Sequence, residues 1–251
     1  MTPEDDAAQL PRWGLGDVGL GFVLAEVAAA VVGVVVLGVL GYTQPDQVPL
    51  WLETVLEIPL WVFLVGVPVV ASQRKGNGPV RDFGWRMRWS DVPLGIGAGL
   101  AGQILLVPLV YWPIFKVLGH SENVSKVAEQ MTNKVHGPAD TVLIFLLVGI
   151  GAPLAEELFF RGLTQRSLLK LRADGANVVV RFLARTNPWS AVVLTAAFFA
   201  ATHFQLLQFA GLFAFGLVLG VLAWRTGRLG PSIWAHLTFN VLAAATLVWK
   251  L

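Results

Sequence analysis

The chain has no cysteine and few charged residues. None of its 251 residues is cysteine, which excludes disulfides, thiolate metal ligands and a cysteine nucleophile. Only 14% of the residues are charged, whereas soluble globular domains carry about 25%. The formal net charge is +2, and the basic residues fall in short clusters between apolar runs. This pattern gives no support for a nucleic-acid partner.

Hydrophobic residues make up 55% of the chain and occur in long runs. About 20 apolar residues cross a hydrocarbon core about 30 Å thick, and seven runs approach that length. They cover residues 18–41, 51–71, 92–118, 140–166, 189–205, 208–226 and 231–250. A lipid-embedded segment must satisfy its own backbone hydrogen bonds, and the alternating pattern of a barrel is absent. The sequence therefore predicts an all-α, polytopic integral membrane bundle of about seven transmembrane helices.

The N-terminal residues are acidic, with Glu4, Asp5, Asp6 and Asp17 against a single arginine, Arg12. This is the wrong charge for a cleaved signal peptide, so we expect a retained first span. We divide the one integral domain into a cytoplasmic tail (1–17), three spans with an extracytoplasmic loop (18–139) and a core of four spans (140–251).

Lysine and arginine gather in alternate connections, those after the second, fourth and sixth spans. These residues are Arg74, Lys75, Arg81, Arg86 and Arg88, then Arg166, Lys170, Arg172, Arg181 and Arg185, then Arg225 and Arg228. The opposite connections hold few, namely Lys126 and Lys134 after the third span. The positive-inside rule then predicts an N-terminus inside and a C-terminus outside. We expect an integral protein of a bacterial plasma membrane.

The fourth span contains three formal charges in the run Glu156-Glu157-Leu158-Phe159-Phe160-Arg161. A charge near the bilayer centre costs on the order of 3 kcal/mol, so these side chains need pairing or an aqueous cavity. Glu157 and Arg161 are four residues apart and can pair on one helix face. Glu156 is rotated by about 100° from Glu157 and is free for another role.

Two later spans carry polar side chains at the same spacing. Phe199 and His203 share one face of the fifth span, and His236 and Asn240 share one face of the seventh. Hydrolysis of a peptide bond requires a base for water, donors for the oxyanion and an acid for the leaving amine. One carboxylate, two imidazoles and an amide can supply all three.

In this order the motifs Glu-Glu-x-x-x-Arg, Phe-x-x-x-His and His-x-x-x-Asn resemble the signature of the CAAX-protease and bacteriocin-processing (CPBP) family. This intramembrane family, also called the Abi family, includes relatives of the type II CAAX prenyl endopeptidase. The resemblance covers about residues 140–250. His-Glu-x-x-His and Gly-x-Ser-x-Gly, the motifs of other proteases, are absent from the sequence.

The resemblance implies an endopeptidase whose site lies within the bilayer. Carried over by position, Glu156 would activate water with help from His203, and His236 and Asn240 would form the oxyanion site. Glu157, Arg161 and Phe199 would be structural or orienting. The family has been described as metalloproteases, yet the glutamate mechanism runs without metal, so we expect no cofactor. A zinc ion held by Glu156, His203 and His236 is the alternative.

Two other functions remain open. Buried glutamate and histidine also build proton relays, so a proton-coupled transporter is one alternative. A catalytically silent immunity or binding protein is the other. For an enzyme, the expected partners are the lipid bilayer and a peptide or membrane-associated protein substrate. The sequence does not choose among prenylated peptides, leader sequences and membrane proteins, and it leaves the oligomeric state open.

The two histidines are predicted at different depths. By helical rise, His203 lies about 20 Å from the inner boundary and His236 about 8 Å. The fifth span is also short. We therefore expect spans five and six to form a short re-entrant hairpin, which is tolerated where it is buried in protein or lines water.

Overall fold

The computed structural model describes residues 11–118, 129–130, 132–171 and 177–249. Within these ranges every regular element is helical, and six helices are long and apolar enough to cross a membrane. They are α1 (Leu15–Leu40), α2 (Leu50–Lys75), the run α4–η3–α5 (Asp91–Val117), the run from α7 to α9 (Pro138–Leu169), α12 (Leu206–Thr226) and α13 (Gly230–Val248). The prediction of an all-α membrane bundle is confirmed. Lys126 and Arg172, counted above for the topology, lie outside the described residues.

The first helix begins earlier than hydropathy predicted. α1 starts at Leu15 and not at residue 18, so the predicted 1–17 boundary falls inside it. The reason is Asp17, whose carboxylate accepts a hydrogen bond from the Gly14 backbone N–H at 3.0 Å. Asp17 also pairs with Lys75 Nζ of α2 at 2.5 Å. A carboxylate in the first turn stabilises a helix, although it lowers the hydropathy of the segment.

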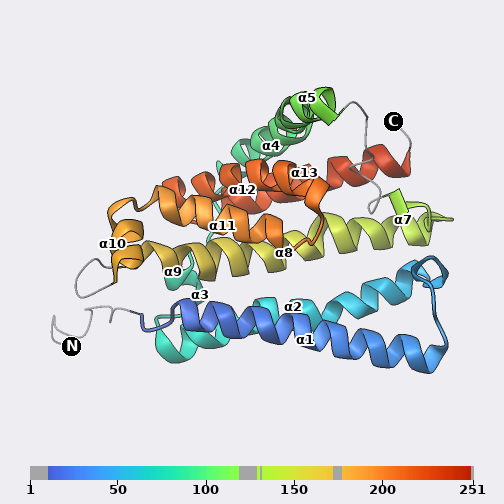
Figure 1. The fold of residues 1–251 in the computed structure, drawn as a ribbon, viewed down its shortest axis with the longest axis horizontal. Coiled ribbons are helices and arrows are strands. Elements are labelled where there is room, and N and C mark those ends of the chain that lie inside the picture. The colour runs from blue at the N-terminus through green and yellow to red at the C-terminus, as the bar shows by residue number, and fades with distance from the viewer. Residues whose placement is uncertain (1–10, 119–128, 131, 172–176, 250–251) are drawn as a thin grey trace.

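The helices form layers around one long central helix (Figure 1). α1 and α2 pair with each other on one side, and α11, α12 and α13 lie on the other. Between these layers runs the helix from α7 (Pro138–Ile144) through α8 (Ala152–Glu156) to α9 (Gln165–Leu169). α4 (Asp91–Ala101) packs on the outer face of α13. The glutamate pair thus lies on the helix that both layers cover.

Two glycines bring α4 close to α13. A Cβ atom added at Gly99 would lie 2.5 Å from the Ala235 carbonyl oxygen, and one at Gly95 would lie 2.8 Å from the Pro231 carbonyl oxygen. Real Cβ atoms do not approach backbone oxygen so closely, so these positions require glycine. The small residues let the two backbones pack against each other, as in other membrane helix pairs.

The fifth span is short. α11 (Trp189–Ala201) has 13 residues, which at 1.5 Å per residue span about 20 Å, less than the hydrocarbon thickness. In Figure 1 the turn from α11 to α12 lies part way along the central helix, not at the end where α1 and α2 are joined. The Tyr111 hydroxyl of α5 (Val107–Leu118) fastens this turn by donating to the Leu207 carbonyl oxygen at 2.7 Å. α11 is thus too short to cross by itself, whereas α12 with 21 residues is long enough, so the short re-entrant hairpin of both helices stays a prediction.

The central helix contains two π-helical stretches, η4 (Phe145–Gly151) and η5 (Glu157–Thr164). In a π-helix the backbone bonds run between residues i and i+5, and such turns are frequent at functional sites. Glu156 is the last residue between them. The sequence analysis assumed a regular α-helix here, because hydropathy does not distinguish the two.

Candidate active site

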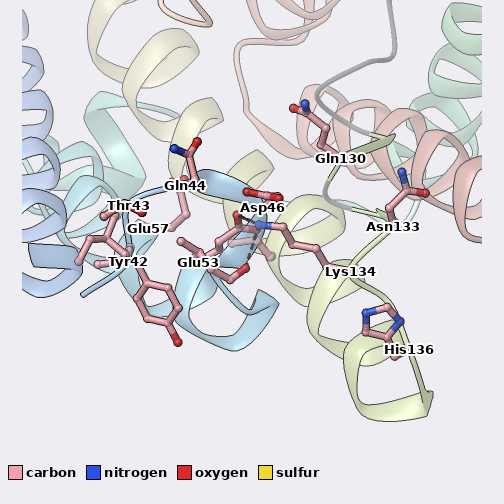
Figure 2. A pocket seen from close by; sticks show the side chains of 14 residues that line it. Tyr42, Thr43, Gln44, Asp46, Glu53, Glu57, Gln130, Asn133, Lys134 and His136 are labelled. Carbon is pink, nitrogen blue, oxygen red and sulfur yellow. Dashed lines mark hydrogen bonds and ion pairs between the residues drawn. The ribbon is translucent and has the colours of Figure 1, made fainter. Parts of the chain in front are cut away.

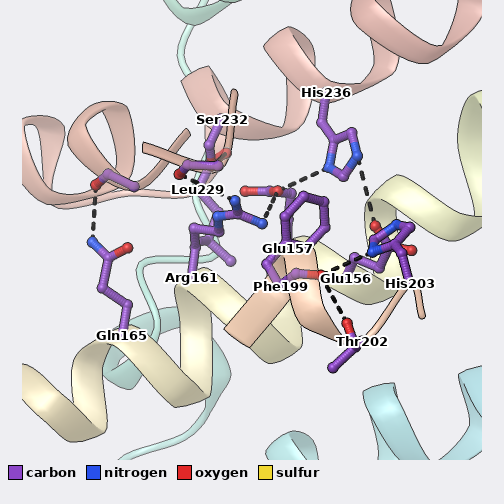
Figure 3. Close-up of polar contacts among 12 residues, drawn as sticks. Glu156, Glu157, Arg161, Gln165, Phe199, Thr202, His203, Leu229, Ser232 and His236 are labelled. Atoms are coloured by element: carbon purple, nitrogen blue, oxygen red, sulfur yellow. Dashed lines mark hydrogen bonds and ion pairs between the residues drawn. The ribbon is translucent and has the colours of Figure 1, made fainter. Parts of the chain in front are cut away.

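Glu157 and Arg161 form a fully buried ion pair, as their spacing predicted. Arg161 Nη1 lies 3.0 Å from Glu157 Oε1, and both side chains have an exposed fraction of 0% (Figure 3). Arg161 Nη2 also donates to the Gly216 carbonyl oxygen of α12 at 3.3 Å. Its guanidinium carbon lies 4.5 Å from the centre of the Phe199 ring. The pair joins the central helix to α11 and α12.

His236 of α13 lies between the two glutamates. Its Nδ1 is 2.9 Å from Glu157 Oε1, and its Nε2 is 3.6 Å from Glu156 Oε2 (Figure 3). A carboxylate can only accept at the first contact, so Nδ1 carries the proton and Nε2 faces Glu156. The exposed side-chain fractions are 4% for His236 and 18% for Glu156. Glu157 therefore orients the imidazole from the buried side, while Glu156 faces more open space.

His203 lies just beyond the C-terminus of α11. Its Nδ1 is 2.8 Å from the Phe199 carbonyl oxygen, four residues earlier. A carbonyl only accepts, so Nδ1 is the donor and Nε2 is left as the basic nitrogen. The Phe199 ring contacts both imidazoles, with centroids 4.9 Å from His203 and 5.6 Å from His236. One aromatic ring thus separates and positions the two histidines.

Asn240 has a structural contact in addition to its predicted place beside His236. Its Nδ2 donates to the Val148 carbonyl oxygen of η4 at 2.9 Å. One of the two amide N–H groups therefore joins α13 to the π-helical stretch that precedes Glu156. The amide has a second N–H group in addition to this contact.

A zinc ion is the alternative to a metal-free site. In the described part of the chain, no three His, Asp or Glu side chains are grouped so that they could hold a metal ion. The Nδ1 contacts of His236 and His203 leave each Nε2 as the nitrogen that could bind one. No step of the reaction proposed for this site uses a metal ion.

Gln165 is a site residue that the sequence analysis missed. Its exposed fraction is 1%, and its Nε2 donates to the Gly220 carbonyl oxygen at 2.9 Å (Figure 3). Arg161 donates to the Gly216 carbonyl oxygen and Gln165 to the Gly220 carbonyl oxygen. The two donors are one turn apart on the central helix, and the two acceptors are one turn apart on α12. The signal was present as a third polar residue continuing the four-residue spacing from Glu157 and Arg161.

The fold and this site define a class, that of polytopic membrane proteins with a buried acid and imidazole centre. The family model for the Type II CAAX prenyl endopeptidase Rce1-like proteins matches residues 138–242. This range contains all three motifs and agrees with the predicted extent. Residues 138–242 are therefore similar to the CAAX protease family, as the motifs predicted. Comparison with curated proteins and with solved structures gives no match.

Proposed function

We propose that the protein is an intramembrane endopeptidase that hydrolyses peptide bonds with water activated by Glu156. The observation that carries this proposal is the 3.6 Å approach of His236 Nε2 to Glu156 Oε2, with Nδ1 held by the buried Glu157. The match to the family model supports a CAAX-type membrane endopeptidase in general.

The facing atoms of Glu156 and His236 are both acceptors when the acid is ionised and the imidazole is neutral. Two acceptors 3.6 Å apart repel unless a proton lies between them or a water molecule bridges them from one side. A water there would donate one hydrogen to Glu156, and its oxygen would become the nucleophile as Glu156 takes the proton. His203, whose Nε2 is the basic nitrogen, would assist as a second base, and the leaving amine would receive the proton held by Glu156.

The oxyanion would be stabilised by His236 and Asn240. His236 would donate through Nε2–H once a proton from solvent has reached that nitrogen, and the buried Glu157 carboxylate, 2.9 Å from Nδ1, would stabilise the resulting positive charge. The second amide N–H of Asn240 is the other donor. Both groups are fixed before the substrate binds, which is the condition for effective charge stabilisation in a low-dielectric site.

The orientation with the N-terminus inside belongs to the same proposal. It places the connections between α2 and α4, between α9 and α11, and between α12 and α13 on the cytoplasmic side. In Figure 1 the short helices α3 (Pro79–Asp82) and α10 (Val178–Arg185) lie at the same end as the described N-terminal residues. The basic residues of these connections therefore share one end of the bundle, as the positive-inside rule requires.

The test is Glu156→Gln, which keeps the shape of the side chain and removes the base. Purified protein in liposomes would receive an internally quenched peptide that ends in farnesyl-Cys-Val-Ile-Met, and its unprenylated counterpart. Loss of a general base lowers the rate by about 10²- to 10⁴-fold. The matched control is Glu26→Gln, an intramembrane glutamate of α1, which should cleave at the wild-type rate. Wild-type cleavage by Glu156→Gln would refute the assignment.

A further inference from the structure

A cavity of about 800 Å³ lies at the end of the bundle where α1 and α2 are joined (Figure 2). Its walls come from that connection, from the first turns of α2 and from the segment before α7. Leu147 of η4 lines it from the central helix. This volume falls within the range of about 300 to 1,000 Å³ that is typical of small-molecule sites.

The charged groups of the lining are predominantly acidic. Asp46, Glu53 and Glu57 contribute three carboxylates, against one lysine, Lys134. Lys134 Nζ pairs with Glu53 and donates to the Val48 carbonyl oxygen at 2.9 Å (Figure 2). Among the described residues, Asp46 and Glu57 form no ion pair. The cavity therefore presents two carboxyl groups without an ion-pair partner beside apolar side chains.

The inner wall of the cavity leads to the proposed catalytic acid. Glu57 lies on α2, which contacts α8, the segment that ends at Glu156. Trp61, one turn further along α2, packs on Gly151, where an added Cβ would lie 2.6 Å from Cζ3 of the indole. Gly151 ends η4, five residues before Glu156. The central helix thus forms one wall of the cavity through Leu147 and also carries Glu156.

We propose that this cavity binds a lysine or arginine side chain of the substrate, next to the peptide bond that Glu156 hydrolyses. The inference rests on the proposed function and adds a substrate class to it. Leu37, Leu56 and Leu147 would contact the methylene stem, and the carboxylates of Asp46 and Glu57 would pair with the cationic head. Long basic side chains commonly divide their contacts in this way, and ionised hydrogen bonds are the strong ones.

The absence of cysteine from the wild-type chain allows a direct test of the charge. Leu56→Cys places one thiol in the cavity, and Ala139→Cys places one at the exposed start of α7, outside the lining. Each protein would react with a cationic trimethylammonium-ethyl methanethiosulfonate and with its anionic sulfonato-ethyl counterpart. The ratio of the two rates cancels the intrinsic reactivity of each thiol and reports the local potential.

The ratio of cationic to anionic rates should be at least about tenfold higher at the Leu56→Cys thiol than at the Ala139→Cys thiol, because a lined cleft concentrates counter-ions. Adding Glu57→Gln to the Leu56→Cys protein should lower the ratio of cationic to anionic rates at that thiol about threefold. Asp140 is a carboxylate at the same end of the bundle that does not line the cavity. Adding Asp140→Asn to the Leu56→Cys protein should therefore leave the rate ratio at that thiol unchanged. Thr43→Cys, also in the lining, provides a second position if the first variant does not fold.

The kind of side chain that the cavity binds is tested by whether a peptide protects the Leu56→Cys thiol from modification. In a Glu156→Gln background, acetyl-Ala-Ala-Lys-Leu-Ala-amide should slow modification of the Leu56→Cys thiol, and the peptide with norleucine in place of lysine should not. Equal protection by both peptides, or equal rate ratios at the two thiols, would overturn the inference. These measurements do not depend on cleavage, so failure of the Glu156→Gln assay and failure of the cavity are separate results.

Discussion

Replacing Arg161 by methionine would isolate the energy of the buried ion pair. The guanidinium lies 3.0 Å from Glu157 Oε1, with both side chains at 0% exposure. Removing one partner of such a pair leaves a buried charge and costs about 3 to 5 kcal/mol. His236 still donates to Glu157, so we expect the lower end of that range, about 3 kcal/mol. The loss of the Phe199 contact is included in this figure, because such terms do not add.

The assay is equilibrium unfolding in mixed micelles, followed by the fluorescence of the ten tryptophans. The double variant Glu157→Gln with Arg161→Met removes both charges, and replacing both partners costs less than removing one. We expect it to lose about 1 to 2 kcal/mol. The control Arg181→Met changes an exposed arginine of α10 and should leave unfolding unchanged. If Arg161→Met is no less stable than the double variant, the charge of Glu157 is not what the arginine stabilises.

Two further predictions concern packing and pH. Gly99→Ala should lower the free energy of unfolding by about 1 to 3 kcal/mol, because the added Cβ meets the Ala235 carbonyl oxygen. Gly97→Ala, on the same helix with open space around it, should have no such cost, and equal losses would contradict the packing argument. Burial of the Lys170 amine against Trp13 lowers the pKa of Lys170 to about 8. Between that value and the unfolded pKa of about 10.4, the unfolded chain binds more protons, so stability should rise with pH in this window. Lys170→Met should remove the rise in denaturant titrations, and an unchanged pH profile would contradict the assignment.

Hydropathy and spacing predicted most of the fold because the bilayer leaves few alternatives. Each of the predicted runs became a helix within a few residues of its expected range, and α11 is as short as its sequence suggested. The first helix starts earlier than predicted because Asp17 accepts a hydrogen bond from the Gly14 backbone N–H. Hydropathy scales count this carboxylate only as unfavourable. The short helices α3 and α10 were not predicted, since they lie in connections where no apolar period exists.

The pairing of Glu157 with Arg161 could be predicted because four-residue spacing brings side chains together in any helix. The contact of Glu157 with His236 could not, since it joins residues 79 positions apart. The same holds for the bond from Asn240 to Val148, which depends on a π-helical stretch with no sequence signature. His136, which belongs to none of the three motifs, is exposed and lines the cavity.

The hydrogen bonds from Arg161 and Gln165 to α12 end on backbone oxygens, not on side chains. Every residue has a carbonyl group, so these contacts constrain the register of α12 but little of its sequence beyond the two glycines. Substitutions on its outer surface should therefore be tolerated. A one-residue insertion before Gly216 would instead rotate both carbonyls by about 100° and displace them by about 1.5 Å, separating both donors from their acceptors at once.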